Sequence, residues 1–261
     1  MQIKLLGWAG VEIEADGERV VVDPLQDARA VFAPLGELAE RCSPPSVLAP
    51  RPGARAGVVT HLHRDHADAA ALAAALAPGA PVLEPKGYGG DGLEQLAIAQ
   101  ADHELAAVGL PRRALQPWAS TTVGPFTLTA LPAVDGTGDP QASWLIEAGA
   151  KRVLHLGDTM FHGWWWRIAE RFGAPDVVLA PINGARLSFA HRVPASTLPG
   201  VMDPEQAALC AELLRAERLV PIHYDGYAID GVYEPVDDAL GRLVAASGRV
   251  VALELGETVE V

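Results

Sequence analysis

Four side chains of metal-ligand type crowd one short segment of this chain, residues 60–66, which reads T-H-L-H-R-D-H. His61, His63, Asp65 and His66 supply imidazole and carboxylate groups, which are common ligands of divalent cations. In an extended segment His61 and His63 point to the same side, while Asp65 and His66 lie on the turn that follows. The spacing therefore allows two adjacent metal ions.

The context of this cluster supports a metal site. Residues 58–60 form a short apolar strand pattern, and an alanine-rich helix is expected over about 67–77, so the cluster lies where a strand turns into a helix. A simpler alternative is that Asp65 caps the helix while backbone groups satisfy the histidines. The cap explains only Asp65, whereas a metal site explains all four side chains, so we favour metal.

Strand patterns dominate the first 160 residues. Antiparallel strands are expected at 3–6, 11–14 and 20–22 around an Asp16-Gly17 turn, and a long Pro-, Gly- and Arg-rich loop at about 33–57. Further strands are expected at 81–83, 114–116, 121–123, 126–131, 143–147, 152–156, 177–180, 219–222, 250–255 and 258–261. A Pro-rich excursion is expected at about 184–202.

Three further helices are expected in the second part of the chain, near 164–172, 203–216 and 236–246. The middle one has a good start, because Asp203 can cap free amides and Pro204 tolerates the first helical position. Two strand-rich halves, each followed by helices, predict an α/β (α+β) fold with two sheets packed face to face and helices outside. The chain is interpreted as a single domain, 1–261.

Composition limits the classes of function. The chain has 20 Lys plus Arg against 33 Asp plus Glu, a formal net charge of -13, and this charge opposes the phosphate backbone of nucleic acid. Only Cys42 and Cys210 are present, so no disulfide framework is expected. Neither a signal peptide nor a membrane-spanning stretch is apparent. We expect a cytoplasmic protein with a small-molecule substrate and without nucleic-acid or membrane partners. The sequence does not exclude a homo-oligomer.

The histidine segment resembles the H-x-H-x-D-H signature of the metallo-β-lactamase superfamily. Other similar segments follow in chain order at 131–135, 156–159, 179–184 and 220–223, so the resemblance covers essentially the whole chain. Within the superfamily the sequence looks closest to the branch of ascorbate-6-phosphate lactonase-like and related Zn-dependent hydrolases. The resemblance implies the metallo-β-lactamase fold, a four-layer αββα sandwich.

The same resemblance implies a set of ligands. His61 and His63 hold one metal, and a second group holds the other: Asp65, His66 and His223. Asp158 bridges the two metals. The remaining ligand of the first metal is usually a histidine, but the segment here reads P-A-V-D-G, so Asp135 is the candidate. The alternatives are that His162 or His191 swings in from a loop, or that the first site is weak.

A carboxylate in place of an imidazole makes the first site harder, which shifts its preference from Zn²⁺ toward Mn²⁺ or Fe²⁺. Two divalent ions, Zn²⁺ or Mn²⁺ with Fe²⁺ as a further option, are therefore the expected cofactors.

Several of these residues also have a simpler structural interpretation. Asp158 is also suited to a turn or a cap, and His223 to a surface imidazole. Asp23 either hydrogen-bonds a ligand histidine or only starts the Asp-Pro turn. His155, inside a strand, is interpreted as a core residue.

Some residues near the ligand positions are candidates for contact with a substrate. His162, Asn183, His191 and Tyr224 lie on expected loops, where binding residues concentrate. The aromatic run 164–166, together with a phenylalanine at 161, has the composition to line an apolar pocket. Adjacent helical residues point in different directions, so at most one or two of these rings can reach the site.

The function that follows is hydrolysis of an ester, lactone or phosphodiester of a small, anionic substrate by water activated at a dinuclear centre. Asp65, Asp158 and His223 are the expected catalytic residues: Asp65 orients the attacking water, and His223 steadies the leaving oxygen. The alternatives are a nuclease-type phosphodiesterase acting on RNA or DNA, an iron-dependent redox enzyme, and a non-catalytic metal-binding module.

Overall fold

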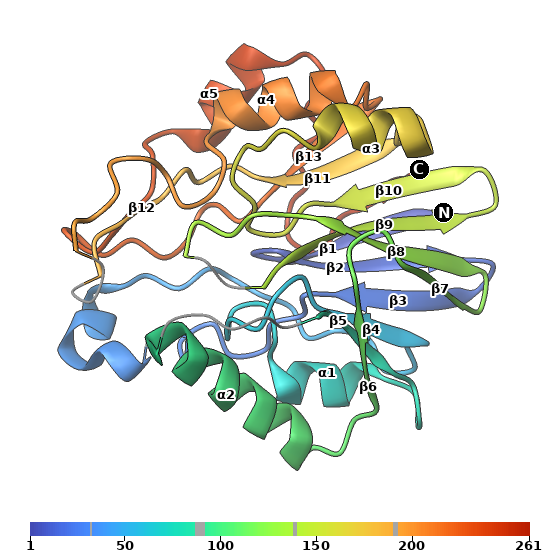
Figure 1. The fold of residues 1–261 in the computed structure, drawn as a ribbon, viewed down its shortest axis with the longest axis horizontal. Helices are drawn as coiled ribbons and strands as arrows, with labels where there is room; N and C mark the ends of the chain where they lie inside the picture. Colours follow the sequence, from blue (N-terminus) through green and yellow to red (C-terminus); the bar gives the residue numbers. More distant parts are fainter. Residues whose placement is uncertain (32, 87–91, 138–139, 190–192) are drawn as a thin grey trace.

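Two β-sheets lie face to face in the computed structural model, and helices cover the outer face of each (Figure 1). The structure describes residues 1–31, 33–86, 92–137, 140–189 and 193–261. The expected four-layer αββα sandwich is therefore confirmed. No helix in these ranges is long and apolar enough to cross a membrane.

The first sheet contains the strands β1 (Gln2–Gly7), β2 (Gly10–Ala15), β3 (Glu18–Val22), β4 (Ala56–Val58), β5 (Val82–Pro85), β6 (Arg112–Leu115) and β15 (Thr258–Glu260). Its order is β15-β1-β2-β3-β4-β5-β6. Antiparallel pairing runs from β15 through β1 and β2 to β3, and parallel pairing from β3 to β6. The opening segment is thus the expected antiparallel meander, and the last strand returns to pair with the first.

The second sheet contains β7 (Ser120–Val123), β8 (Phe126–Pro132), β9 (Ala142–Ala148), β10 (Lys151–His155), β11 (Val177–Pro181) and β13 (Arg218–Ile222), in the order β13-β11-β10-β9-β8-β7. The strands β10, β11 and β13 are parallel, and β9 is antiparallel to both β8 and β10. Consequently β8, β10 and β13 all run in one direction. The segments that follow these three strands leave the sheet at the same edge.

Alternating side chains on the strands build separate cores on the two faces of each sheet. In β9, Trp144 and Ile146 are buried between the two sheets, whereas Leu145 is buried in the helical layer. This alternation follows from the two-residue period of a strand. The helices α3 (Trp165–Phe172), α4 (Pro204–Leu213) and α5 (Ala239–Ala246) cover the second sheet, and α1 (Ala69–Ala75) and α2 (Gly92–Ala107) cover the first (Figure 1).

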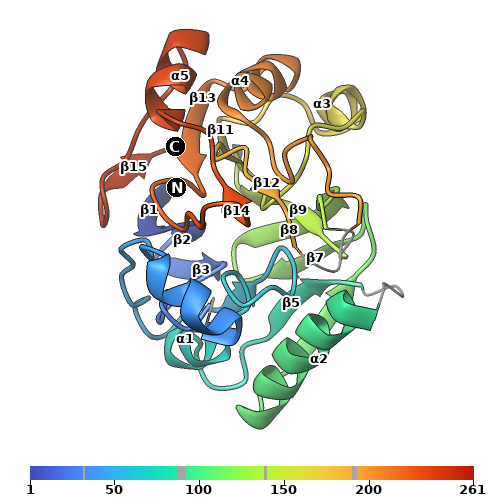
Figure 2. The same ribbon diagram turned by 90° about the vertical axis from the view of Figure 1, so that its left-hand side faces the viewer.

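The structure differs from the sequence predictions in several elements. The helix α2 was not expected, and the loop expected at 33–57 contains a 3₁₀ helix, η1 (Ala33–Arg41), as well as β4. A two-stranded sheet of β12 (Arg186–Leu187) and β14 (Tyr233–Glu234) was also not expected; it lies on the side that faces the viewer in Figure 2. The strand expected at 250–255 is wrong, because this segment makes only an isolated bridge between Val250 and Leu219.

The start of α4 allows a test of how the helical layer is held. Asp203 and Gln206 form a reciprocal capping box: the Gln206 amide donates to the Asp203 carboxylate at 2.8 Å, and the Gln206 side chain accepts from the Asp203 amide at 3.3 Å. We expect Asp203→Ala to lower the free energy of unfolding by about 1 kcal/mol in urea denaturation. Glu212→Ala, at an exposed position of the same helix, should change it by less than about 0.5 kcal/mol. Equal effects of the two changes would contradict the capping role.

Candidate metal centre

The segment 60–66 leaves β4 as a turn and does not belong to the helix that follows. The N-cap of α1 is Asp68, whose carboxylate accepts hydrogen bonds from the amides of Ala70 and Ala71 at 2.9 and 3.0 Å. Asp65 is therefore not the cap, and the simpler alternative for this residue is wrong. Its carboxylate instead turns toward two histidines.

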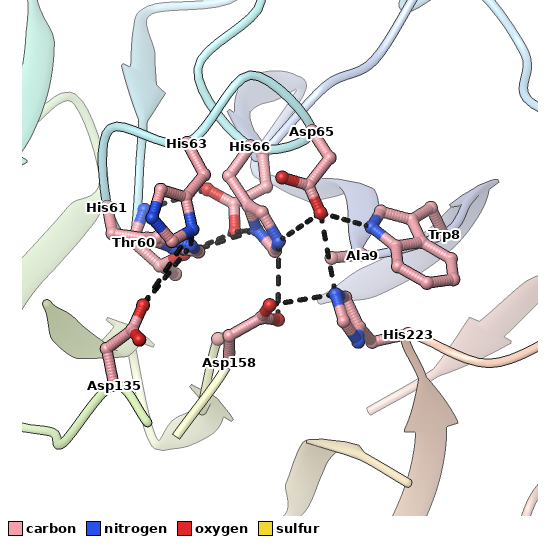
Figure 3. Close-up of polar contacts among 12 residues, drawn as sticks. Trp8, Ala9, Thr60, His61, His63, Asp65, His66, Asp135, Asp158 and His223 are labelled. Atoms are coloured by element: carbon pink, nitrogen blue, oxygen red, sulfur yellow. Dashed lines mark hydrogen bonds and ion pairs between the residues drawn. The ribbon is translucent and has the colours of Figure 1, made fainter. Parts of the chain in front are cut away.

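Four donor groups meet in the first of two clusters, which we call the Asp158 group: Asp65, His66, Asp158 and His223. His66 Nε2 lies 3.2 Å from Asp65 Oδ2 and 3.2 Å from Asp158 Oδ1. His223 Nε2 lies 2.8 Å from Asp158 Oδ2 and 3.5 Å from Asp65 Oδ2. Figure 3 shows these four side chains facing one another, although they come from three separate segments of the chain.

Three more donor groups form the second cluster, which we call the Asp135 group: His61, His63 and Asp135. His61 Nε2 and His63 Nδ1 are 2.9 Å apart, and each lies 3.8 Å from Asp135 Oδ2 (Figure 3). The two groups are neighbours, because the rings of His61 and His66 have centroids 4.2 Å apart. The structure thus brings together all seven residues that the sequence predicted as ligands, with Asp158 beside His66 and His223.

Several buried polar atoms of the Asp158 group lack normal hydrogen bonds among the described residues, as expected for atoms that bind a cation. Among the described residues, His66 Nε2, Asp158 Oδ1 and His223 Nε2 are buried without a hydrogen bond of normal geometry, although they lie within ion-pair distance of one another. Buried polar atoms without partners cost free energy, so such atoms point to a ligand that binds between them. Imidazole and carboxylate donors on one buried point fit a divalent cation.

A support network holds the ligand histidines from behind. Asp23 is fully buried; its Oδ2 lies 2.8 Å from His66 Nδ1, and it accepts hydrogen bonds from the Thr60 amide and hydroxyl at 2.8 and 2.6 Å. The Thr60 hydroxyl lies 3.0 Å from His61 Nδ1. Of the two alternatives for Asp23, the structure therefore shows the contact with a ligand histidine. Such a contact orients the ring and directs its other nitrogen to the metal side.

Two glycines allow the ligand loops to approach each other. Gly157 has φ +64°, and a Cβ on it would lie 2.7 Å from the Thr60 Cβ. Gly136 has no room for a side chain, since its Cβ would lie 2.3 Å from the backbone of Gly200. Each glycine adjoins a candidate ligand, Asp158 and Asp135 respectively, so close backbone contact places both carboxylates.

The electrostatics of the two groups differ. Burial alone would raise the pKa of Asp158 and of Asp65, but the charges of His223 and His66 hold both pKa values well below the usual range. Burial opposes protonation of His66, yet Asp158 and Asp65 raise its pKa well above the ordinary value. In the Asp135 group, burial raises the pKa of Asp135 to about 6, with His63 opposing the shift.

The candidate substrate contacts are dispersed. Tyr224 and Asn183 line a cavity of about 490 Å³ that none of the seven donors lines. Asn183 is buried; its amide nitrogen donates to the Tyr233 hydroxyl at 2.8 Å and its oxygen accepts from the Ala185 amide at 3.2 Å. Asn183 therefore holds its neighbours, and both Asn183 and Tyr224 stay predictions for substrate contact.

The histidines outside the two groups have other surroundings. His162 stacks on Trp165 with centroids 3.7 Å apart, and burial lowers its pKa to about 4. His155 is fully buried, as expected for a core residue, and its Nε2 lies 2.9 Å from the Ala9 carbonyl oxygen. His191 lies outside the described residues. Of the aromatic run, Trp165 is buried in the helical core, while its neighbours on both sides are exposed.

Sequence reasoning missed Trp8, whose indole nitrogen donates to Asp65 Oδ2 at 2.9 Å (Figure 3). The contact joins residues 57 positions apart, so no local spacing indicates it. The one local hint is a tryptophan in the turn between two glycines, Gly7 and Gly10, where a small residue is usual.

An αββα sandwich with imidazole and carboxylate donors gathered at one edge is the arrangement of a class of metal-binding proteins. A family model described as the beta-lactamase superfamily domain matches residues 18–224. The chain belongs to the metallo-β-lactamase superfamily.

Relatives match over the full length. A UPF0173 metal-dependent hydrolase of Thermococcus kodakarensis is 25% identical, over 100% of this chain and 99% of the relative. One of Pyrobaculum aerophilum is 27% identical, over 100% of both chains. The solved structure of Igni18, a metallo hydrolase from Ignicoccus hospitalis, is 21% identical with a TM-score of 0.64, over 99% of this chain and 98% of that one.

The support network gives a first test of the site. We expect Asp23→Asn to weaken divalent metal binding by about 10- to 100-fold, because the amide keeps the shape but loses the charge that orients His66. Metal affinity can be measured by calorimetric titration of the metal-free protein. Asp176→Asn is the matched control, since this carboxylate also accepts from a backbone amide, that of Arg152 at 2.9 Å, but lies outside both groups. A metal affinity unchanged in Asp23→Asn would contradict the role.

The raised pKa values of His66 and His223 give a second test. The carboxylates beside them raise both pKa values and so favour the protonated imidazoles in the metal-free protein, and a protonated nitrogen cannot bind a cation. Metal binding must therefore release protons, and affinity should rise as the pH increases from about 6 to about 8. Titration calorimetry in buffers of different ionisation enthalpy counts these protons. Binding without proton release in this window would show that the two rings are not ligands.

Proposed function

We propose that this protein is a hydrolase that uses two divalent cations to cleave an ester, lactone or phosphodiester bond of a small, anionic molecule. The observation that carries the proposal is the convergence of seven donors in two adjacent groups, with buried atoms that lack normal hydrogen bonds among the described residues. The archaeal relatives that match along the whole chain are named metal-dependent hydrolases, which supports a hydrolytic reaction.

Each group has the donors for one cation. His61, His63 and Asp135 would hold the first, and His66, His223, Asp65 and Asp158 the second. When bound, such a pair of cations would lower the pKa of a bound water toward neutral pH and would polarise the oxygen under attack. It also places positive charge at one point of an acidic chain, which favours an anionic substrate.

The protein's own groups have distinct tasks in this reaction. Asp65 would stay ionised beside a bound cation, so its carboxylate can accept a hydrogen bond from the attacking water and orient it. His223, which directly precedes Tyr224 in the chain, would help to hold the cation that steadies the leaving oxygen. Asp158, between two histidines, keeps both rings in place.

The cavity lined by Tyr224, the residue that follows His223 in the chain, has the size of a small-molecule site. A volume of about 490 Å³ is typical of small-molecule sites, which range from about 300 to 1,000 Å³. The residues that line this cavity include both signs of charge, with Arg41, Asp225 and Asp238. A net charge of -13 argues against a long polyanion such as RNA.

The ligand assignment predicts the behaviour of two variants. Asp158→Ala and His66→Ala should each lower bound metal and reduce hydrolysis by at least about 100-fold, because each removes a ligand and leaves the other buried charges without compensation. The measurement is metal analysis of protein purified without chelator, followed by an activity screen over esters, lactones and phosphodiesters. Full activity in either variant would show that the ligands are elsewhere. Glu212→Ala, purified and assayed in the same way, is the control for metal or activity lost during purification.

One feature of the Asp135 group favours iron-dependent redox chemistry as a second candidate. Two histidines and one carboxylate, His61, His63 and Asp135, are the donor set of many non-haem Fe²⁺ oxygenases. The same purification distinguishes the two candidates: bound iron with oxygen consumption favours redox chemistry, and hydrolysis with bound Zn²⁺ or Mn²⁺ favours the hydrolase.

A further inference from the structure

Trp8 occupies a backbone position that bulky residues avoid. It lies in the two-residue turn between β1 and β2, where Gly7 pairs with Gly10, and its φ is +53°. Hairpin turns of this length usually place glycine, asparagine or aspartate at positive φ, and a bulky residue there carries strain. Strain of this kind persists where the surroundings hold the residue in place, and it often marks a functional position.

Trp8 contacts two members of the Asp158 group. Its indole nitrogen donates to Asp65 Oδ2 at 2.9 Å, and its ring lies against the His223 ring with centroids 3.9 Å apart. Its carbonyl oxygen accepts from the His223 amide at 2.9 Å. Side chain and backbone of one residue thus contact two candidate ligands that are far apart in the sequence (Figure 3).

The rest of this turn is tied to a third member of the group. The carbonyl oxygen of Ala9 lies 2.9 Å from His155 Nε2, and His155 Nδ1 accepts from the Gly157 amide at 3.3 Å. Gly157 directly precedes Asp158 in the chain. In the described part of the chain, the polar and ring contacts of the Trp8 side chain are with Asp65, His223 and Tyr227. None of these residues belongs to the Asp135 group.

The chemistry of indole suits a position beside a cation. An indole N–H donates without a formal charge, so it can fix a carboxylate without repelling a metal, which a lysine, arginine or protonated histidine would do. The side chain is only 5% exposed, so water does not compete strongly for the Asp65 oxygen. The tilted ring contact limits the orientations open to His223.

We propose that Trp8 is a positioning residue that sets the metal affinity of the Asp158 group, through its hydrogen bond to Asp65 and its ring contact with His223, and leaves the Asp135 group unaffected. This inference rests on the proposed function, because it requires that both groups hold cations. It adds a determinant that lies in the first hairpin of the chain, far in sequence from every ligand.

The test is titration of metal-free protein with Co²⁺, followed by calorimetry and by the visible absorption of bound Co²⁺, which reports ligand geometry. Trp8→Phe keeps a ring against His223 but removes the N–H donor. We expect this variant to weaken one of two binding events by about 10-fold or more and to shift the absorption of that site only. In the background of Asp135→Ala, which lacks a ligand of the other group, the remaining event should show the same loss.

Trp144→Phe is the matched control. Trp144 is also buried, and its indole donates to a backbone carbonyl, that of Val59 at 3.1 Å. The control should lower the thermal midpoint while it preserves the ratio of the two Co²⁺ affinities. A general packing role for Trp8 predicts the same result for Trp8→Phe, so an unchanged ratio in Trp8→Phe overturns the inference.

Failure of the proposed function gives a different result. If the wild-type protein binds no Co²⁺, or binds it equally well after His66→Ala, then the two-cation centre is wrong. If the wild-type protein binds two ions and Trp8→Phe weakens both equally, the centre stands and the selective role of Trp8 is wrong.

Discussion

The fold depends on a costly arrangement: three carboxylates and four imidazoles share a largely buried volume at the edge of two sheets. Removing charged groups from water costs several kcal/mol for each ion, and mutual attraction repays this only where the geometry is good. The short distances within the Asp158 group and the absence of normal hydrogen bonds on several of its buried atoms, among the described residues, indicate that a positive ion completes the balance. The surrounding structure can be understood as the means of holding these groups together.

Strand direction and turn geometry share that task. Because β8, β10 and β13 run in one direction, the residues after them reach the same edge, and β4 supplies the remaining segment from the other sheet. Sheet geometry alone places the chain only approximately. Close backbone approach at Gly136 and Gly157, and the buried carboxylate of Asp23 behind His66, restrict the final positions of the side chains.

Local patterns in the sequence were enough for the layers and for most of the ligand set. The histidine segment combines a strand, a turn and a helix within a few residues, so spacing alone indicated His61, His63, Asp65 and His66. The more distant ligands came from resemblance, and the structure brings Asp135, Asp158 and His223 to the same place. The role of Asp65 became decidable only when Asp68 proved to be the helix cap.

The failures have physical causes as well. The segment of α2 lacks a clear apolar stripe at helical spacing, so periodicity did not reveal the helix. The strands β12 and β14 are two residues each, too short for any alternation. The pattern at 250–255 alternates like a strand, but a strand needs a partner, and only Val250 finds one, at Leu219. The contact of Trp8 with Asp65 spans 57 positions and depends wholly on tertiary structure.

The origin of the ligands in two different sheets has a consequence for the life of the protein in a cell. His61, His63, Asp65 and His66 extend from β4 in one sheet, and Asp135, Asp158 and His223 from strands of the other. Cations bound between these ligands would join the two sheets, and ligands that bind only the native state stabilise it by mass action. The stability of the native state would then depend on the metal supply, and a metal-free chain would be more open to proteolysis.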